Sequence, residues 1–315
     1  MTARILRVTA AADRSGGLTQ KFLRLLDQAN LSQYVKSGDQ VAVKMHFGEP
    51  GNARYIRPIF PVLLVDRLKE LGARPFVTDT AVLYKSLRHQ AWDYYQVARR
   101  NGFTPEVLGC PLLISGGLRD RSVKVAVEEP LRLSEVGVSA EIYDADALIS
   151  LAHVTLHLLY PLGAALKNMG MGGVDINTKL AMHDARGTSP RHLALQEATA
   201  DAAKAVLAGF SGKFFAINLL LDITPDCDCF DKTDLPVVPD LGILAGIDPI
   251  ALDRASYDMI VAAPGYPGCK LENSDGMKSG ADKVRPIYPR IDPEAYFRIT
   301  ERAGIGSTQY QIIDV

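Results

Sequence analysis

The stretch that decides the fold is KFFAINLLLDITPDCDCFD, residues 213–231. Its first half, residues 214–221, is apolar apart from Asn218. An apolar run of this length that ends at a turn signal is typical of a strand covered on both faces. Pro225 has no N–H group for a sheet hydrogen bond, so we expect the strand to end by residues 222–223. The stretch therefore predicts a central strand with a loop beyond it.

Apolar runs of strand length alternate with helical patterns on both sides of this stretch. We expect further strands at residues 5–9, 40–45, 74–77, 147–151, 241–245 and 309–315, and helices at residues 18–29, 59–71, 89–101, 190–207 and 293–303. The alternation predicts an α/β fold with a mostly parallel layered sheet flanked by helices. Residues 123–136 alternate in polarity and predict a small antiparallel hairpin excursion. The length fits one domain over residues 1–315 or two lobes, 1–145 and 146–315.

Composition narrows the classes of partner. The chain has a net charge of −1 and no long basic run, which argues against nucleic acid and membrane surfaces as partners. No apolar run reaches the roughly 18 residues of a membrane span, and the N-terminus lacks the apolar core of a signal peptide. We therefore expect a cytoplasmic protein. In that compartment its 4 cysteines indicate metal ligands, reactive thiols or buried apolar residues rather than disulfides.

The loop after the central strand carries a Cys-x-Cys pair, Cys227 and Cys229. Aspartates crowd around it, at positions 222, 226, 228, 231 and 234. Nearby negative charge disfavours two thiolates, and a bound cation reverses that preference. The loop therefore predicts a metal centre, and the alternative is two ordinary thiols in a solvated loop. Cys269, in a glycine- and proline-rich loop, is the third candidate ligand, whereas Cys110 fits a buried apolar role.

Polar side chains follow several of the expected strands. They are His46 with Glu49, Asp79 with Thr80, His153 with His157, and Asp222 with the cysteine pair. In open α/β sheets, ligands bind beyond the carboxyl ends of the strands. We therefore expect these segments to line one crevice that holds a small-molecule substrate.

Four of these polar residues are candidates for proton transfer. His46, His153 and His157 titrate near neutral pH, and Lys167 can supply a positive charge or a proton. The segment after Lys167 is glycine-rich, and we expect a turn whose N–H groups cradle an anion or cofactor. The residues of this expected turn are Asn168, Gly170 and Gly172. Structural histidines and a salt-bridged lysine in a tight turn are the alternatives. The sequence has no Walker loop or GxGxxG motif, so a flavin or nicotinamide has no motif support.

Several blocks are similar to those of a known family: KMHFGEPGN (44–52), GAALKNMGMG (163–172), KLAMH (179–183) and NLLLDITPDCDC (218–229). With them the chain resembles the uncharacterised iron–sulfur centre proteins, known as domain of unknown function 362. It looks like a short member, because the two-cluster ferredoxin module that longer members carry after the KLxxH block is absent. Gly173 also stands where members often have cysteine.

The resemblance and the Cys-x-Cys loop together favour an iron–sulfur-dependent enzyme. A 4Fe–4S cluster held by Cys227, Cys229 and Cys269 would leave one iron open. We expect reductase or deoxygenase chemistry on a small organic substrate, with an external electron donor. Two alternatives stay open: a non-redox hydro-lyase or hydrolase that uses a metal or cluster as a Lewis acid, and a non-enzymatic electron-transfer or scaffold protein. The sequence sets neither the substrate nor the oligomeric state.

Overall fold

The computed structural model describes residues 2–14, 16–184 and 190–315. An eight-stranded sheet with the order β12-β1-β11-β10-β7-β2-β3-β4 runs through the molecule. Its strands are β1 (Ala3–Thr9), β2 (Gln40–Lys44), β3 (Arg74–Thr80), β4 (Leu112–Ser115), β7 (Ala147–His153), β10 (Phe214–Leu220), β11 (Gly242–Gly246) and β12 (Tyr310–Asp314). The sheet draws strands from both halves of the chain. The predicted α/β fold with a mostly parallel sheet is confirmed.

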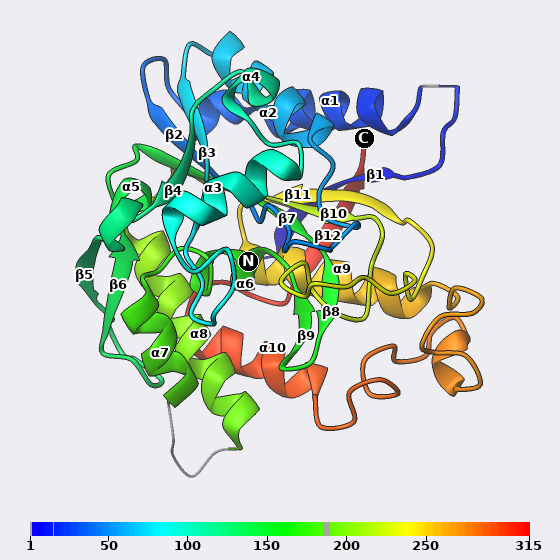
Figure 1. Ribbon diagram of the computed structural model, residues 1–315. Helices are drawn as coiled ribbons and strands as arrows, with labels where there is room; N and C mark the ends of the chain where they lie inside the picture. The colour runs from blue at the N-terminus through cyan, green and yellow to red at the C-terminus, as the bar shows by residue number, and fades with distance from the viewer. Residues whose placement is uncertain (1, 15, 185–189) are drawn as a thin grey trace.

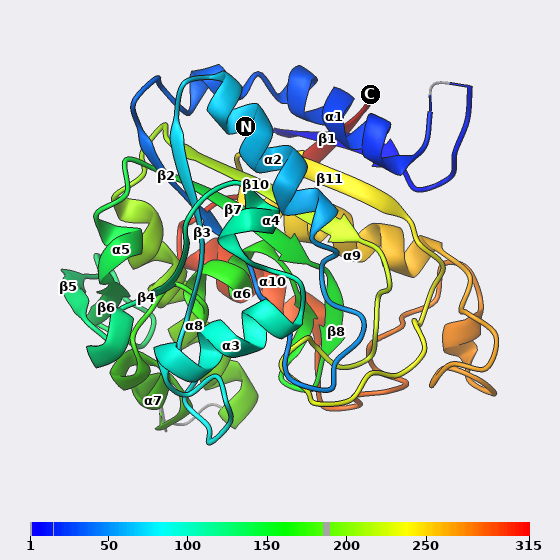
Figure 2. The same cartoon turned by 45° about the horizontal axis from the view of Figure 1, so that its top comes forward.

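Helices cover both faces of this sheet (Figures 1 and 2). One face packs against α1 (Leu18–Ala29), α2 (Ile59–Glu70) and α3 (Ala91–Arg100), and α4 (Pro105–Leu108) lies beside α2. The other face packs against α6 (Ala165–Gly170), α8 (Arg191–Ala208), α9 (Pro249–Ala262) and α10 (Pro293–Arg302), with α7 (Ile176–Asp184) beside α8. None of the described helices is long and apolar enough to cross a membrane.

Strand β10 is buried along its whole length, as the opening stretch predicts. It runs parallel to β7 and antiparallel to β11. Side chains alternate across a strand, so Phe215 and Ile217 join one core while Ala216 and Leu220 join the other. Asn218 is the polar exception because its amide donates hydrogen bonds to side chains of α9.

Two small hairpins leave the main sheet. The first pairs β5 (Ser122–Ala126) with β6 (Glu135–Ser139) and lies beside α5 (Ala140–Tyr143), which confirms the hairpin expected at residues 123–136. The second pairs β8 (Thr155–His157) with β9 (Tyr160–Gly163). It follows β7 directly, so it carries His157 beyond the carboxyl end of that strand.

The glycine-rich segment after β9 corrects one expectation. Residues 165–170 form the helix α6, which includes Asn168 and Gly170, and of the expected turn residues only Gly172 lies in a turn after this helix. The Asp253 carboxylate accepts hydrogen bonds from the first two N–H groups of this helix, at 2.9 and 3.0 Å. Gly170 serves close packing, because a Cβ atom there would lie 2.3 Å from the Thr199 carbonyl oxygen of α8. The glycine therefore allows two helices to approach and exposes no N–H cradle.

Candidate active site

A cavity of about 270 Å³ opens beyond the carboxyl ends of the central parallel strands. Strands β10, β7, β2 and β3 are adjacent in the sheet and run parallel to one another, so the loops that follow them meet at one edge. The cavity is lined from these loops, from the β8–β9 hairpin, and from α6 and α7. Among the residues singled out in the sequence, the lining includes His46, His153, His157, Lys167, Asn168, Gly172, Cys227 and Cys229. Gly170 and Cys269 are not part of it.

Cys227 and Cys229 are joined by a disulfide, with their Cα atoms 5.3 Å apart. The sequence favours thiols here, with the Cα spacing of an extended segment at about 6–7 Å. The chain turns instead, because the Phe230 N–H group donates to the Cys227 carbonyl oxygen at 3.0 Å. That turn brings the cysteines into the range in which a disulfide forms. Cys227 is buried in the cavity wall, and Cys229 is half-buried.

Cys269 lies apart from this pair. Its thiol is buried in the core behind the loop that follows α9, where it receives a hydrogen bond from the Leu271 N–H group at 3.4 Å. The sulfur also lies 3.7 Å from the Val237 carbonyl oxygen, which accepts from the thiol. The structure therefore does not assemble the three-cysteine ligand set. The residues present do not fit a 4Fe–4S cluster held by three thiolates of this chain.

His157 lies beside the disulfide. One of its ring nitrogens and the two sulfurs of Cys227 and Cys229 are all within 4.8 Å of one another, which makes these residues a candidate metal site in the described part of the chain. Nδ1 of His157 accepts a hydrogen bond from the Leu159 N–H group at 3.0 Å. Burial, followed by the nearby positive charge of Lys167, holds the pKa of His157 well below its usual value, so the ring is neutral. A neutral ring that accepts at Nδ1 carries its proton on Nε2 and offers a donor there.

His153 is fixed by hydrogen bonds at both ring nitrogens. Nδ1 lies 2.8 Å from an Asp228 carboxylate oxygen, and Nε2 lies 2.6 Å from the Leu221 carbonyl oxygen. Burial lowers the pKa of His153, but the charge of Asp228 and these hydrogen bonds outweigh it, so the pKa is raised. Both partners are acceptors, so the protonated ring satisfies them. His153 therefore anchors the cysteine loop through Asp228, with neither nitrogen free for a ligand.

His46 is also engaged at both nitrogens. The Gly48 backbone nitrogen lies 2.9 Å from Nδ1, and Arg88 Nη1 lies 2.7 Å from Nε2. Burial and the positive charge of Arg88 lower the pKa of His46 to about 3. The ring is therefore uncharged at neutral pH, and a neutral imidazole accepts at one nitrogen only, so His46 accepts a hydrogen bond from Gly48 or from Arg88 but not from both. These two residues cover both nitrogens and leave neither open to a ligand. Arg88 is in turn held by Glu49, 2.6 Å away.

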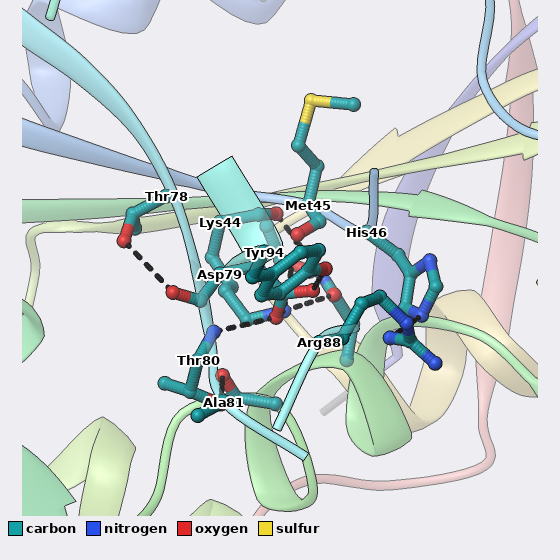
Figure 3. A network of polar contacts seen from close by, with 12 residues as sticks. Lys44, Met45, His46, Thr78, Asp79, Thr80, Ala81, Arg88 and Tyr94 are labelled. Atoms are coloured by element: carbon teal, nitrogen blue, oxygen red, sulfur yellow. Dashed lines mark hydrogen bonds and ion pairs between the residues drawn. The ribbon is translucent and has the colours of Figure 1, made fainter. Parts of the chain in front are cut away.

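A buried ion pair joins strands β2 and β3 beside the cavity, and hydrogen bonds extend it to helix α6 (Figure 3 shows the pair). Lys44 Nζ lies 2.9 Å from an Asp79 carboxylate oxygen. It also donates to the side-chain oxygen of Asn168 at 2.8 Å, and the Asn168 amide donates back to the Lys44 carbonyl oxygen. Tyr94 donates its hydroxyl hydrogen to Asp79. Asn168 thus fixes α6, and with it Lys167, against the sheet.

Two further lysines line the cavity without an ion pair to a carboxylate in the described part of the chain. Lys167 Nζ lies 4.0 Å from Cys227 Sγ. Lys179 donates to the Thr80 hydroxyl at 2.7 Å and to the Ala81 carbonyl oxygen. Burial is the main reason that the pKa of each lysine falls to about 8. Lys44 and Lys179 begin the family-like blocks at residues 44–52 and 179–183, but no local pattern marks either lysine as a site residue.

The fold and this cavity define an α/β protein with a cavity at the carboxyl edge of a mostly parallel sheet. The chain belongs to the family described as domain of unknown function (DUF362), whose model matches residues 41–258. The family resemblance drawn from the sequence blocks is thus confirmed.

The chain is similar in fold to two solved structures. One is the lactate racemase apoprotein from Thermoanaerobacterium thermosaccharolyticum, with a TM-score of 0.50 and 11% sequence identity, over 85% of this chain and 60% of that chain. The other is a protein from Thermotoga maritima, with a TM-score of 0.48 and 10% identity, over 79% of this chain and 58% of that chain. This chain therefore spans about 60% of the length of the racemase apoprotein. No curated protein matches it significantly.

Proposed function

We propose that the protein is a reductase in which Cys227 and Cys229 cycle between dithiol and disulfide. The substrate is a small organic molecule held in the cavity. One observation carries the proposal: the two sulfurs are joined at the wall of a ligand-sized cavity, with Lys167 Nζ 4.0 Å from Cys227 Sγ. A positive charge at that distance favours the reactive thiolate over the thiol when the pair is reduced.

The reaction begins when the Cys227 thiolate attacks a sulfur or oxygen atom of the substrate and breaks its bond to a neighbouring sulfur or oxygen. The leaving atom takes the electron pair of that bond and a proton. The Cys229 thiolate then attacks Cys227 Sγ, forms the disulfide and releases the rest of the substrate, which takes a second proton. Two electrons and two protons pass from the dithiol to the substrate. Small disulfides and peroxides are the substrate classes with such a bond.

The neighbouring side chains suit these proton movements. With a pKa lowered to about 8 by burial, Lys167 gives up a proton more readily than an ordinary lysine and can supply the leaving atom. The Nε2–H group of the neutral His157 is a hydrogen-bond donor for a developing anion. Cys229 is the less buried sulfur, so we assign it the attack by an external dithiol that restores the reduced pair.

A second candidate rests on the close approach of His157, Cys227 and Cys229. In their reduced form these residues could hold a metal ion that acts as a Lewis acid, as in the hydro-lyase alternative. Ligation through His157 Nε2 would require the proton to move to Nδ1 and would break the hydrogen bond from Leu159. The iron–sulfur cluster that the resemblance implies is a proposal of the same kind, and it needs a further ligand besides these residues.

The experiment uses protein purified without air and reduced. We expect it to consume a small disulfide or a small alkyl peroxide, one molecule per Cys227–Cys229 disulfide formed, with a mass loss of two hydrogens in the peptide that carries both cysteines. Cys227→Ser should abolish the reaction, and Cys269→Ala, the matched control, should leave it intact. Two results together would refute the reductase and favour the metal candidates. The first is that the protein consumes neither substrate, and the second is that it holds stoichiometric metal, or iron with sulfide, which Cys227→Ser removes.

A further inference from the structure

The charges that line the cavity do not balance. Two cationic groups of the lining are matched by a carboxylate: Lys44 by Asp79 and a protonated His153 by Asp228. Arg88, which lies behind His46 and outside the lining, is matched by Glu49. Lys167 and Lys179 have no such match among the residues that the structure describes. An ammonium group has three N–H donors. Lys179 uses two of them on Thr80 and Ala81. Among the described residues, Lys167 Nζ has one hydrogen-bond contact, the Cys227 sulfur, and it lies 5.8 Å from the centre of the Tyr160 ring.

A buried hydroxyl group lies unused beside Lys167. Thr155 is 1% exposed and lines the cavity, and its Oγ1 has no hydrogen-bond partner among the residues that the structure describes. A Cβ atom built on Gly163 would lie 3.2 Å from this Oγ1, 3.9 Å from Lys167 Cδ and 4.0 Å from Cys227 Cβ. Thr155, Lys167 and Cys227 therefore meet beside Gly163 in the cavity wall, where a side chain on Gly163 would crowd the Thr155 hydroxyl. A buried polar atom without a partner is unfavourable, so a ligand that bonds to this hydroxyl supplies a hydrogen bond that the folded chain leaves unmade.

The rest of the wall is largely apolar. It includes Val82, Leu83, Leu158, Leu159, Met171 and Phe230. The volume of about 270 Å³ lies just below the range of sites for drug-sized ligands, about 300–1,000 Å³. The ligand that this wall and these charges fit is small, partly apolar and negatively charged.

We propose that the cavity binds a small organic anion, a carboxylate or a phosphate monoester, whose negative charge is met by Lys167 and Lys179 and whose acceptor atoms reach the Thr155 hydroxyl. This inference rests on the proposed function, because it names the chemical class of the substrate that the reductase would bind in the same cavity. Its apolar part lies along the leucine-rich wall. The reacting bond of a substrate bound in this way lies near Cys227, since Thr155 and Lys167 meet it beside Gly163.

The test measures binding without turnover. It uses the Cys227→Ser/Cys229→Ser double variant, which has no redox pair, and calorimetric titration with butyrate, propyl phosphate and neutral butyramide. We expect at least one of the two anions to bind and butyramide to bind at least about 10-fold more weakly, since a charge-assisted hydrogen bond contributes about 1.5–3 kcal/mol. Which anion binds distinguishes the carboxylate from the phosphate.

Single substitutions then assign the charge. In the same background, Lys179→Met and Lys167→Met should each weaken anion binding about 10- to 100-fold. Lys167→Met removes a buried charge that has no carboxylate partner, so its melting temperature should not fall, which separates lost binding from lost folding. Lys179→Met also loses the hydrogen bonds to Thr80 and Ala81, so its binding is measured well below its melting temperature. Gly163→Ala should also weaken binding, because its methyl group enters the space beside Thr155. The control is Lys213→Met, because Lys213 already pairs with Asp39 at 3.3 Å and lies outside the cavity lining.

Three results would overturn the inference: neither anion binds, butyramide binds as tightly as the anions, or both cavity lysines can be replaced without loss. Failure of the reductase leaves a different signature. In that case the anion binds with the expected dependence on Lys167 and Lys179, while the wild-type protein reduces neither a small disulfide nor a small peroxide.

Discussion

Replacing Lys44 by methionine tests the buried ion pair beside the cavity. The side chains of Lys44 and Asp79 are 2% and 4% exposed, and their charged atoms are 2.9 Å apart. The variant leaves the Asp79 carboxylate buried, with hydrogen bonds only from Tyr94 and the Thr80 N–H group. It also removes the donor to Asn168.

The size of the effect follows from this geometry. Removing one partner of a buried pair costs about 3–5 kcal/mol, because it strands the other charge. A typical free energy of unfolding is about 5–15 kcal/mol, so Lys44→Met should remove a large share of it. Lys213→Met is the matched control: its side chain is 40% exposed, and such a pair contributes below about 1 kcal/mol.

The assay is urea denaturation followed by circular dichroism, at pH 7 and at lower pH. Burial raises the pKa of Asp79, but the charge of Lys44 outweighs it and holds the pKa below its usual value. The wild-type protein therefore loses the stability of this pair only as pH falls through that low pKa. In Lys44→Met the pKa of Asp79 rises, so protonation relieves the stranded charge, and the deficit should shrink as pH falls. A deficit below about 1 kcal/mol at pH 7, or one that grows at lower pH, would refute the reasoning.

Three other predictions concern stability and the cysteines. Burial raises the pKa of Asp253 to about 6, so the free energy of unfolding of the wild-type protein should fall as pH rises from the usual aspartate range through 6. Asp253→Asn should remove that pH dependence and cost about 1–3 kcal/mol at pH 7, and urea titrations at several pH values check both results. Gly170→Ala should cost about 1–3 kcal/mol in the same assay, because its methyl group would overlap the Thr199 carbonyl oxygen, and an unchanged midpoint would contradict the close packing of α6 on α8. A thiol titration of air-exposed protein, unfolded without reductant, should find two reactive thiols, Cys110 and Cys269, and a titration after reduction should find four. Four reactive thiols before reduction would contradict the disulfide.

The elements of the fold were predictable from local patterns. Residues 214–221 are apolar on both faces of a strand, and only a central position in a sheet buries both faces. Helix α1 was predicted with its observed bounds, Leu18–Ala29, because its apolar spacing matches the helical period. The turn predicted at Asn168, Gly170 and Gly172 was placed too early, because the glycines indicate a turn by local preference, whereas the helix continues through Gly170 and only Gly172 lies in the turn after it. The contact of Gly170 with Thr199 and the cap from Asp253 come from distant parts of the chain and favour the helix.

For the candidate site, the sequence could predict only which types of polar residue follow the strands, and not how these residues contact one another. The sequence placed His46, His153 and His157 there on equal terms, because each is an imidazole at a strand end. Their hydrogen bonds separate them: His46 and His153 are engaged at both nitrogens, whereas His157 keeps a free Nε2. These partners include residues up to 75 positions away, and no local pattern specifies them.

The sequence by itself determined that strands and helices alternate, that residues 214–221 form a central strand of the sheet, and that a cysteine pair follows this strand. These features depend on the order of neighbouring side chains along the chain. Only the tertiary structure decided which charges are balanced. Lys44 and Asn168 are 124 positions apart in the chain yet in contact, and Lys167 and Lys179 lack a carboxylate partner in the described residues. Charge balance depends on distances through space, and those distances exist only once the chain has folded.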